Sequence, residues 1–219
     1  MDLYYMPVSP SCWSVLLLNR QLGLSINLKP IDFQAGDHKK ESFLKINPAH
    51  TIPTLTVGDE YALGESRSIM VYLVESQTNN GTHSLYPLDA KLRGLIHNRL
   101  DFDLGTLYQR FVAYCSPLYT SGTQGTEENR AKAHEALETL DIFLGKFRFA
   151  AADHLTIADF SLMATVSAFD LCYFDRSKYE NVSKWYKACT KELVGYEDVI
   201  LKGFPEWRKF IPNPELITK

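Results

Sequence analysis

Two kinds of hydrophobic pattern divide the chain. Up to about residue 77, short apolar runs with polar alternation predict strands that alternate with short helices. From about residue 90 onward, apolar residues recur every three or four positions, which predicts helices alone. The polar run at 78–89 has too few periodic apolar residues to form an element. We therefore expect one domain over 1–77, a linker over 78–89 and a second domain over 90–219.

The first domain opens with a strand–helix–strand unit. Residues 2–18 form a short apolar strand that turns directly into a helix ending at Gly23, and 25–33 alternates well enough for a second strand. A crossover of this length joins parallel strands, so these two strands should be neighbours. The further predicted elements are a short helix over 41–46, a strand over 49–57 entered through Pro53, an antiparallel strand over 61–63 and a helix opening at Glu65. Together these elements predict an α/β domain with a four-stranded mixed sheet and helices on both faces.

The second domain is predicted to be all-helical. One apolar stripe predicts a long helix to about Cys115; its members are Ile96, Leu100, Leu104, Leu107 and Phe111. A second helix is expected over 127–147, antiparallel to the first. Thr156 and Asp159 form a capping-box variant before the very apolar run 160–172, which should be a buried helix at the core of this domain. Helices over 181–193 and 199–208 complete the pattern.

The junction of the first strand and helix is the strongest candidate for chemistry. Ser9-Pro10-Ser11-Cys12 has the spacing of a Cys-x-x-Cys motif with serine in the first place, which excludes a dithiol reaction. A hydroxyl beside the free N–H groups of a helix start is suited to holding an anion such as a thiolate. The alternative is that Ser9 or Ser11 only caps the helix.

Composition narrows the function classes. The 219 residues are 45% hydrophobic and 22% charged with a net charge of −3, so the chain lacks the basic excess that nucleic-acid binding requires. No apolar run approaches the length of a membrane span, and the N-terminus lacks a signal-like pattern, so we expect a cytoplasmic protein without a membrane partner. Four widely spaced cysteines predict reduced thiols and no metal site.

Several motifs together resemble the cytosolic glutathione transferases over essentially the whole chain. They are DLYYMP followed by Ser9, KINPAHTIPTL, ESRSIMVYLVE, RLDFDLGTLYQRF and LTIADFSLMATVSAF. The set is most similar to the insect delta class, with the epsilon class next. The resemblance implies a thioredoxin-like glutathione-binding domain, an all-helical domain with a hydrophobic substrate site, and a homodimer. It also implies detoxification by conjugation of the glutathione thiolate, with glutathione as co-substrate and no metal.

The resemblance also implies residue roles. The Ser9 hydroxyl would donate a hydrogen bond to the glutathione sulfur and favour its thiolate form. His50, helped by His38, would bind the glycine carboxylate. The backbone of Ile52, oriented by a cis Pro53, would pair with the cysteinyl part like an added strand.

At the other end of the ligand, Glu65 would accept the γ-glutamyl ammonium and Ser66 would bind the γ-glutamyl carboxylate, with Arg67 adding positive charge. The hydrophobic substrate would meet aromatic side chains, each of which could equally belong to the core: Tyr108, Phe111, Tyr114, Tyr119 and Phe204.

Three positions depart from the delta-class pattern. Gly64 replaces a bulky aromatic residue and Ala49 replaces a glutamine, so both remove side chains near the expected glutathione site. We therefore expect weakened glutathione binding, which a Gly64→Trp change should improve. Asp101 replaces a frequent aromatic residue and should alter either the dimer contact or the substrate cleft.

Two other functions fit the same residues. A binding protein of this fold could sequester apolar ligands with little turnover. Thiol–disulfide exchange through Cys12 is the third reading, although this cysteine should be buried in the first helix. The sequence does not name the physiological electrophile, because apolar contacts discriminate similar substrates only modestly.

Overall fold

The computed structural model describes residues 1–77 and 83–212. Its first part contains β1 (Asp2–Tyr5), α1 (Pro10–Leu22), β2 (Asn27–Pro30), a 3-10 turn (Asp37–Lys39), α2 (Glu41–Leu44), β3 (Thr54–Val57), β4 (Tyr61–Leu63) and α3 (Ser66–Ser76). The four strands form one sheet in the order β2-β1-β3-β4. β1 pairs in parallel with β2, whereas β1–β3 and β3–β4 are antiparallel. This confirms the predicted mixed sheet, although β2 and β3 are shorter than expected.

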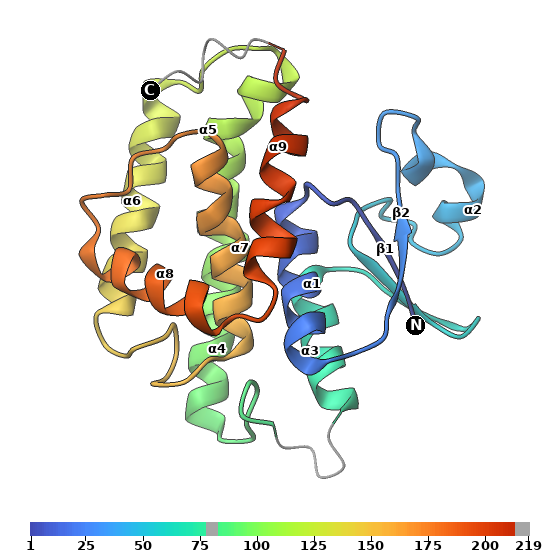
Figure 1. The fold of residues 1–219 in the computed structure, drawn as a ribbon, viewed down its shortest axis with the longest axis horizontal. Coiled ribbons are helices and arrows are strands. Elements are labelled where there is room, and N and C mark those ends of the chain that lie inside the picture. The colour runs from blue at the N-terminus through green and yellow to red at the C-terminus, as the bar shows by residue number, and fades with distance from the viewer. Residues whose placement is uncertain (78–82, 213–219) are drawn as a thin grey trace.

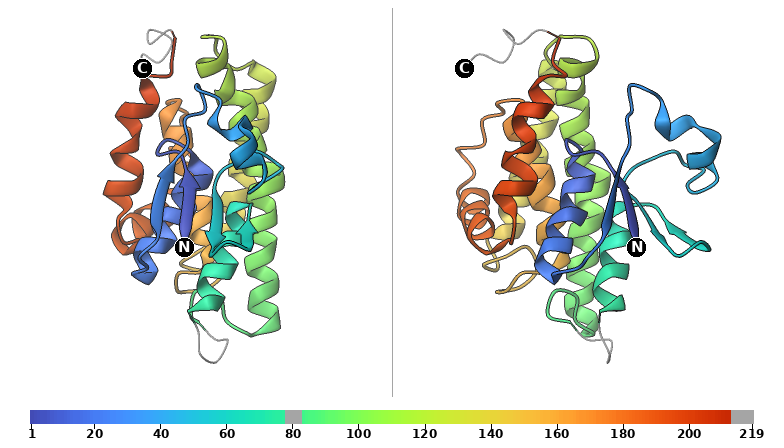
Figure 2. Two further views of the ribbon diagram at one scale, coloured as in Figure 1. Left: turned by 90° about the vertical axis from the view of Figure 1, so that its right-hand side faces the viewer. Right: turned by 45° about the vertical axis from the view of Figure 1, so that its right-hand side comes forward.

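Helices lie on both faces of the sheet. α1 and α3 lie between the sheet and the helical part of the molecule, whereas α2 lies on the outer side, as the right-hand view of Figure 2 shows. Helix α1 begins at Pro10, which needs no N–H there, and ends at Gly23 with φ 64°. The left-handed conformation lets the N–H groups of Gly23 and Leu24 bond to carbonyls of the last helical turn. Gly23 therefore ends the helix where the sequence predicted.

In the second part, the regular elements of the described residues from 90 onward are all helices (Figure 1). It contains α4 (Ala90–Phe102), a π-helical segment η2 (Asp103–Leu107), α5 (Tyr108–Thr120), α6 (Glu127–Leu144), α7 (Ile157–Leu171), α8 (Glu180–Glu192), a second π-helical segment η3 (Glu197–Leu201) and α9 (Gly203–Arg208). The predicted long helix thus contains a π-helical segment. Leu104 is 41% exposed, so its place in the predicted apolar stripe was wrong. Because η2 has a wider turn than an α-helix, Leu104 departs from the 3.6-residue spacing on which the predicted stripe was based.

Helix α7 forms the core of the helical part. All its residues except Asp170 are buried, as the apolar run predicted. The Asp159 carboxylate accepts hydrogen bonds from the backbone N–H and hydroxyl of Thr156, completing the predicted capping box. The same carboxylate also accepts from the N–H of Ala150 and the indole Nε1–H of Trp185. One buried aspartate therefore holds a helix start, a loop and α8 together.

Helix α1 joins the two parts of the molecule. It packs against α7 on one side and α3 on another (Figures 1 and 2). Every residue from Cys12 to Asn19 is buried, so the helix has no solvent-facing side over these two turns. The start of α1, where Ser9 stands, is therefore held by both parts of the molecule.

The cysteines differ from the expectation of four reduced thiols. Cys115 in α5 and Cys172, which follows α7, form a disulfide with their Cα atoms 6.0 Å apart. The sequence could not suggest this pair because the packing of α5 on α7 brings together residues 57 positions apart. Cys12 and Cys189 are free and buried.

No helix within 1–77 or 83–212 is long and apolar enough to cross a membrane. Part of the predicted linker, residues 78–82, lies outside the described residues. The domain limits at 77 and 90 therefore stay predictions.

Candidate functional site

Two cavities meet at the start of α1. We call the first the serine–histidine cavity; its lining is Met6, Ser9, Ser11, Phe33, His38, Lys39, His50, Thr51, Ile52 and Tyr108. We call the second the aromatic cavity; its lining is Met6, Val8, Ser9, Pro10, Phe33, Gln34, Tyr108, Phe111, Tyr119, Trp207 and Phe210. Ser9 and Tyr108 are the two hydroxyl-bearing side chains common to both linings. A molecule bound in one cavity can therefore meet a molecule bound in the other beside Ser9.

The turn before α1 fixes the position of Ser9. The indole N–H of Trp13 donates to the Pro7 carbonyl at 2.6 Å, and the Ser9 N–H donates to the Met6 carbonyl at 3.1 Å. Ser9 is the N-cap residue of α1, yet its side chain makes no capping hydrogen bond. Capping alone therefore does not account for this serine, which belongs to the lining of both cavities.

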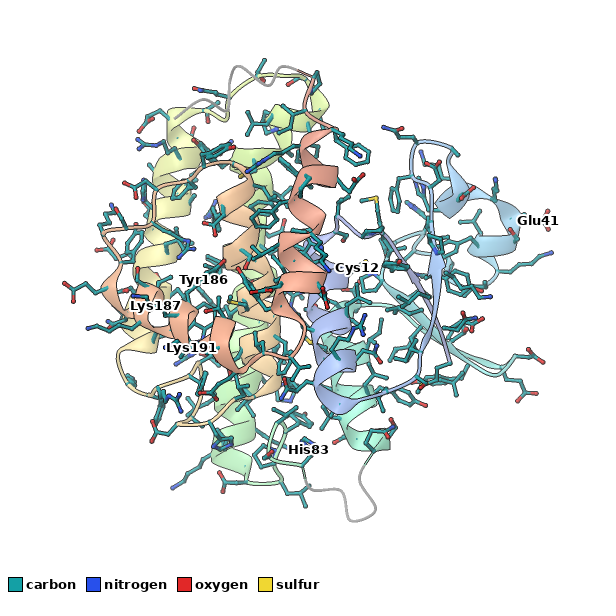
Figure 3. All side chains as sticks on the ribbon, in the orientation of Figure 1. Cys12, Glu41, His83, Tyr186, Lys187 and Lys191 are labelled. Carbon is teal, nitrogen blue, oxygen red and sulfur yellow. A yellow bond between two sulfur atoms is a disulfide. The ribbon has the colours of Figure 1, made fainter. Side chains whose placement is uncertain are left out.

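Cys12 is placed where it cannot act as a thiolate. Its side chain is 0% exposed on α1, deep in the molecule where α1 meets the helical part (Figure 3). Burial raises the pKa of the Cys12 thiol to about 11, although hydrogen bonds with Met6 and Ser9 oppose this shift. The buried, protonated thiol argues against thiol–disulfide exchange.

His38 and His50 line the same cavity but differ in environment. His38 is 8% exposed and stacks on Phe33 with ring centroids 4.0 Å apart. Burial lowers the pKa of His38, and repulsion from Lys39 and His50 adds to the effect. His50 is exposed, with φ 48°, and its N–H bonds to the Asn47 carbonyl. The two imidazole rings lie 6.3 Å apart.

Ile52 presents free backbone groups to the serine–histidine cavity. The Ile52–Pro53 peptide bond is cis, and β3 begins one residue later at Thr54. Within the described residues, Ile52 makes no backbone–backbone hydrogen bond. Its N–H and C=O can therefore pair with an extended peptide-like ligand.

Glu65, Ser66 and Arg67 lie at the start of α3, away from these two linings. Glu65 has φ 62° at the N-cap, and Ser66 is 4% exposed as the first helical residue. Glu65 and Arg67 line a third cavity, which we call the flank cavity, together with Asp101 and residues of α3 and α4. Asp101 therefore borders this cavity and lies outside the aromatic one.

Arg67 is held by a buried partner that the sequence did not reveal. Its guanidinium forms an ion pair with Asp103, which is 0% exposed, and its Nε–H donates to the Leu100 carbonyl at 3.2 Å. Ser161 also donates to the Asp103 carboxylate. Burial raises the pKa of Asp103, whereas Arg67 and Ser161 favour its ionised form. This network fixes the start of α3 against α4 and α7.

The aromatic candidates separate into two groups. Tyr108, Phe111 and Tyr119 line the aromatic cavity, and burial raises the pKa of both tyrosines. Tyr114 instead packs edge-on against Phe174 with centroids 5.2 Å apart. Phe204 packs on Trp13 at 6.0 Å, and neither residue belongs to the cavity lining.

Sequence reasoning missed several lining residues. They are Met6, Val8, Pro10, Ser11, Phe33, Gln34, Lys39, Thr51, Trp207 and Phe210. Phe33 belonged to the predicted strand over 25–33, but β2 ends at Pro30 and leaves Phe33 in the segment before α2. Lys39 lies in the 3-10 turn of the same segment, where no periodic pattern indicates orientation. Pro53 and Ser66 belong to none of the three linings, although each adjoins a residue that does.

Comparison with known proteins identifies this arrangement. Residues 3–81 match the family model for the N-terminal domain of glutathione S-transferase, and residues 123–188 match the model for its C-terminal domain. The chain belongs to the glutathione S-transferase family. Members of this family use glutathione as a co-substrate, and the protein is a transferase by this membership.

Solved glutathione transferases of insects share the whole fold. A delta-class enzyme of Nilaparvata lugens is 36% identical with a TM-score of 0.90, and the match covers 99% of each chain. A Bombyx mori enzyme is also 36% identical, with a TM-score of 0.90, over 96% of this chain and 97% of that one. An epsilon-class enzyme of the housefly Musca domestica is 33% identical with a TM-score of 0.84, over 94% of each chain.

Within residues 1–77 and 83–212, no group of three or more His, Cys, Asp or Glu side chains is placed so that it could hold a metal ion.

Proposed function

We propose that the protein conjugates the thiolate of glutathione to hydrophobic electrophiles, and that Ser9 promotes formation of the thiolate. The observation that carries this proposal is the Ser9 side chain, which borders both cavities and makes no capping hydrogen bond. A thiol of pKa near 8.5 is only a few per cent ionised at pH 7, so a hydroxyl donor beside the sulfur raises the reactive fraction.

In this proposal glutathione lies with its sulfur at Ser9 and its glycine near His38 and His50. The cysteinyl backbone pairs with Ile52, whose orientation the cis Pro53 sets. The γ-glutamyl group then extends toward the N-terminus of α3, where Glu65, Ser66 and Arg67 supply its partners. These roles rest on the family resemblance and on the places of the side chains.

The electrophile occupies the aromatic cavity, with its reactive atom toward Ser9. Tyr108, Phe111 and Tyr119, together with Trp207, offer broad apolar contact suited to varied ligands. Tyr114 and Phe204 act as packing residues behind this wall. Detoxification in the cytoplasm by a homodimer completes the proposal and rests on the resemblance alone.

The pH profile of kcat/KM for glutathione tests the role of Ser9. Ser9→Ala removes one hydrogen bond to a charged sulfur, worth about 1.5–3 kcal/mol, which corresponds to a rise of about one to two units in the thiol pKa. We expect conjugation at pH 7 to fall by about tenfold to a hundredfold and to recover partly at higher pH.

Ser14→Ala is the matched control. Ser14 lies on the same helix, but its hydroxyl donates to the Ser11 carbonyl and lines neither cavity. An unshifted profile with near-normal activity in Ser9→Ala would contradict the proposed role. A wild-type protein that binds glutathione and apolar ligands tightly but turns over no electrophile would support the binding-protein alternative, which the largely apolar aromatic cavity also fits.

A further inference from the structure

The Cys115–Cys172 disulfide lies between two residues of the aromatic cavity. Phe111 and Tyr119, which line that cavity, stand four residues before and four residues after Cys115 on α5. Residues four apart lie on one face of a helix, so the cysteine and both rings share a face of α5. We propose that the disulfide positions these two rings for the hydrophobic electrophile. The inference rests on the proposed function, because it assumes that the electrophile occupies the aromatic cavity.

On the α7 side, the disulfide adds a covalent bond next to a ring contact. Helix α5 packs against α7 (Figure 1), and Phe111 meets Phe169 of α7 edge-on with ring centroids 5.4 Å apart. Cys172 directly follows the end of α7 and is bonded to Cys115. Both cysteines are buried in the core. While the bond is intact, α5 therefore cannot slide or rotate along α7 beside Phe111.

The same bond reaches the α9 side of the cavity. Tyr119 packs edge-on against Trp207 of α9 with ring centroids 5.6 Å apart, and both residues line the aromatic cavity. The next residue, Arg208, places its guanidinium 5.5 Å from the centre of the Tyr173 ring. Tyr173 directly follows Cys172. The disulfide therefore anchors the residue on which the end of α9 rests.

The backbone of α5 gives Tyr119 less support than an uninterrupted helix would. Pro117 lies inside α5 between Cys115 and Tyr119, and it has no N–H to donate to the Ala113 carbonyl. That carbonyl accepts from the side-chain amide of Asn129 instead, at 3.0 Å. One bond of the helical ladder is thus missing beside the turn that carries Tyr119. The disulfide supplies a constraint at the point where the helix lacks one.

Two glutathione derivatives isolate the aromatic cavity from the rest of the site. S-methylglutathione and S-benzylglutathione share the glutathione part, but only the benzyl group is large enough to contact the aromatic rings. Their dissociation constants are measured by calorimetry for wild type and for the double variant Cys115→Ala/Cys172→Ala. Because the freed rings must be ordered on binding, S-benzylglutathione should bind the double variant about twofold to tenfold more weakly. Binding of S-methylglutathione should be unchanged.

Steady-state kinetics should show the same division. The KM for an aromatic electrophile should rise in the double variant by about twofold to tenfold, whereas the KM for glutathione should stay as in wild type. Cys189→Ala is the matched control, because Cys189 is a free, buried cysteine that lines neither cavity. It should leave both KM values and both dissociation constants as in wild type.

A Tyr119→Leu background separates positioning from a general loss of stability. Removing the disulfide should weaken S-benzylglutathione binding less in this background, because one of the two positioned rings is already absent. Wild type kept reduced with a phosphine should bind as the double variant does, and reoxidation should restore tight binding. The reduced protein supplies the comparison even where the double variant does not fold.

Three results would overturn the inference. The first is an unchanged ratio of the two dissociation constants after removal of the disulfide, in an enzyme that conjugates glutathione, which would leave the proposed function standing. The second is an equal loss of binding in the wild-type and Tyr119→Leu backgrounds, which would assign the bond to stability alone. The third is a wild-type protein that conjugates no electrophile, which would overturn the proposed function as well.

Discussion

Gly64 lies against the side chain that supports the cavity segment. A Cβ atom at Gly64 would approach the Asn47 amide nitrogen to 3.3 Å. That nitrogen donates to Thr54 Oγ1 at 2.8 Å and to the Thr51 carbonyl at 3.2 Å. Asn47 therefore ties together the segment that carries His50 and Ile52, and Gly64 leaves it room.

We expect Gly64→Ala to raise the KM for glutathione by about fivefold, equivalent to ~1 kcal/mol, because the added carbon displaces Asn47. Gly64→Trp should raise it further, the reverse of the effect expected from the sequence. Steady-state kinetics at varied glutathione concentration measure both. Gly94→Ala is the control, since a Cβ there meets nothing within 4 Å. A lowered KM for glutathione in Gly64→Trp would instead support the sequence-based expectation that Gly64 leaves a side chain missing near the glutathione site.

At the residue scale, a motif helps where it fixes a residue to an element. Ser9, His38, His50 and Ile52 line one cavity, and their roles toward glutathione stay predictions. Loop residues such as Lys39 carry no such signal, because a loop side chain can face either solvent or ligand. The ion pair of Asp103 with Arg67 was missed for another reason. The two residues lie 36 positions apart on different helices, and the sequence did not specify how these helices pack.

Among the helices, the start of α7 should be the most sensitive to mutation. Asp159→Ala leaves buried donors of Ala150, Thr156 and Trp185 without an acceptor. Since each unsatisfied buried donor costs about 1–3 kcal/mol, we expect a loss of about 3–5 kcal/mol in the free energy of unfolding. Urea unfolding followed by circular dichroism measures this loss.

Asp89→Ala provides the comparison. Asp89 caps α4 at an exposed position and accepts one bond, from the Leu92 N–H at 2.8 Å. Its loss should cost only about 0.5–2 kcal/mol. Equal effects of the two substitutions would mean that the Asp159 contacts to the loop and to α8 contribute little.

At the element scale, helix starts and stops were predictable because single residues set them. Gly23 ends α1, and Thr156 with Asp159 starts α7. The π-helical segment η2 was not predictable from the sequence. A single wider turn changes the spacing of the apolar residues so little that the stripe still matches an α-helix. Leu104 shows the resulting error. Strands β2 and β3 are shorter than predicted. The alternation of apolar and polar residues continues in the sequence beyond the last residue that pairs with a neighbouring strand.

For the whole molecule, the state of the cysteines is directly testable. Alkylation of the unfolded, unreduced protein should modify Cys12 and Cys189 and leave Cys115 and Cys172 unmodified. Mass spectrometry of peptides counts the modified sites, and prior reduction should allow all four to react. Four modified cysteines without reduction would mean that α5 and α7 are joined by packing alone, as the sequence-based expectation of reduced thiols requires.

The burial of residues 12–19 of α1 affects the design of chimeric enzymes. Grafting the helical part of a relative onto this N-terminal part, in order to import a new substrate range, would replace the α7 surface on which α1 rests. A mismatch of a single methylene there would tilt the helix that presents Ser9. A functional chimera should therefore exchange α1 and α7 as a matched pair, with the crossover points placed outside both helices.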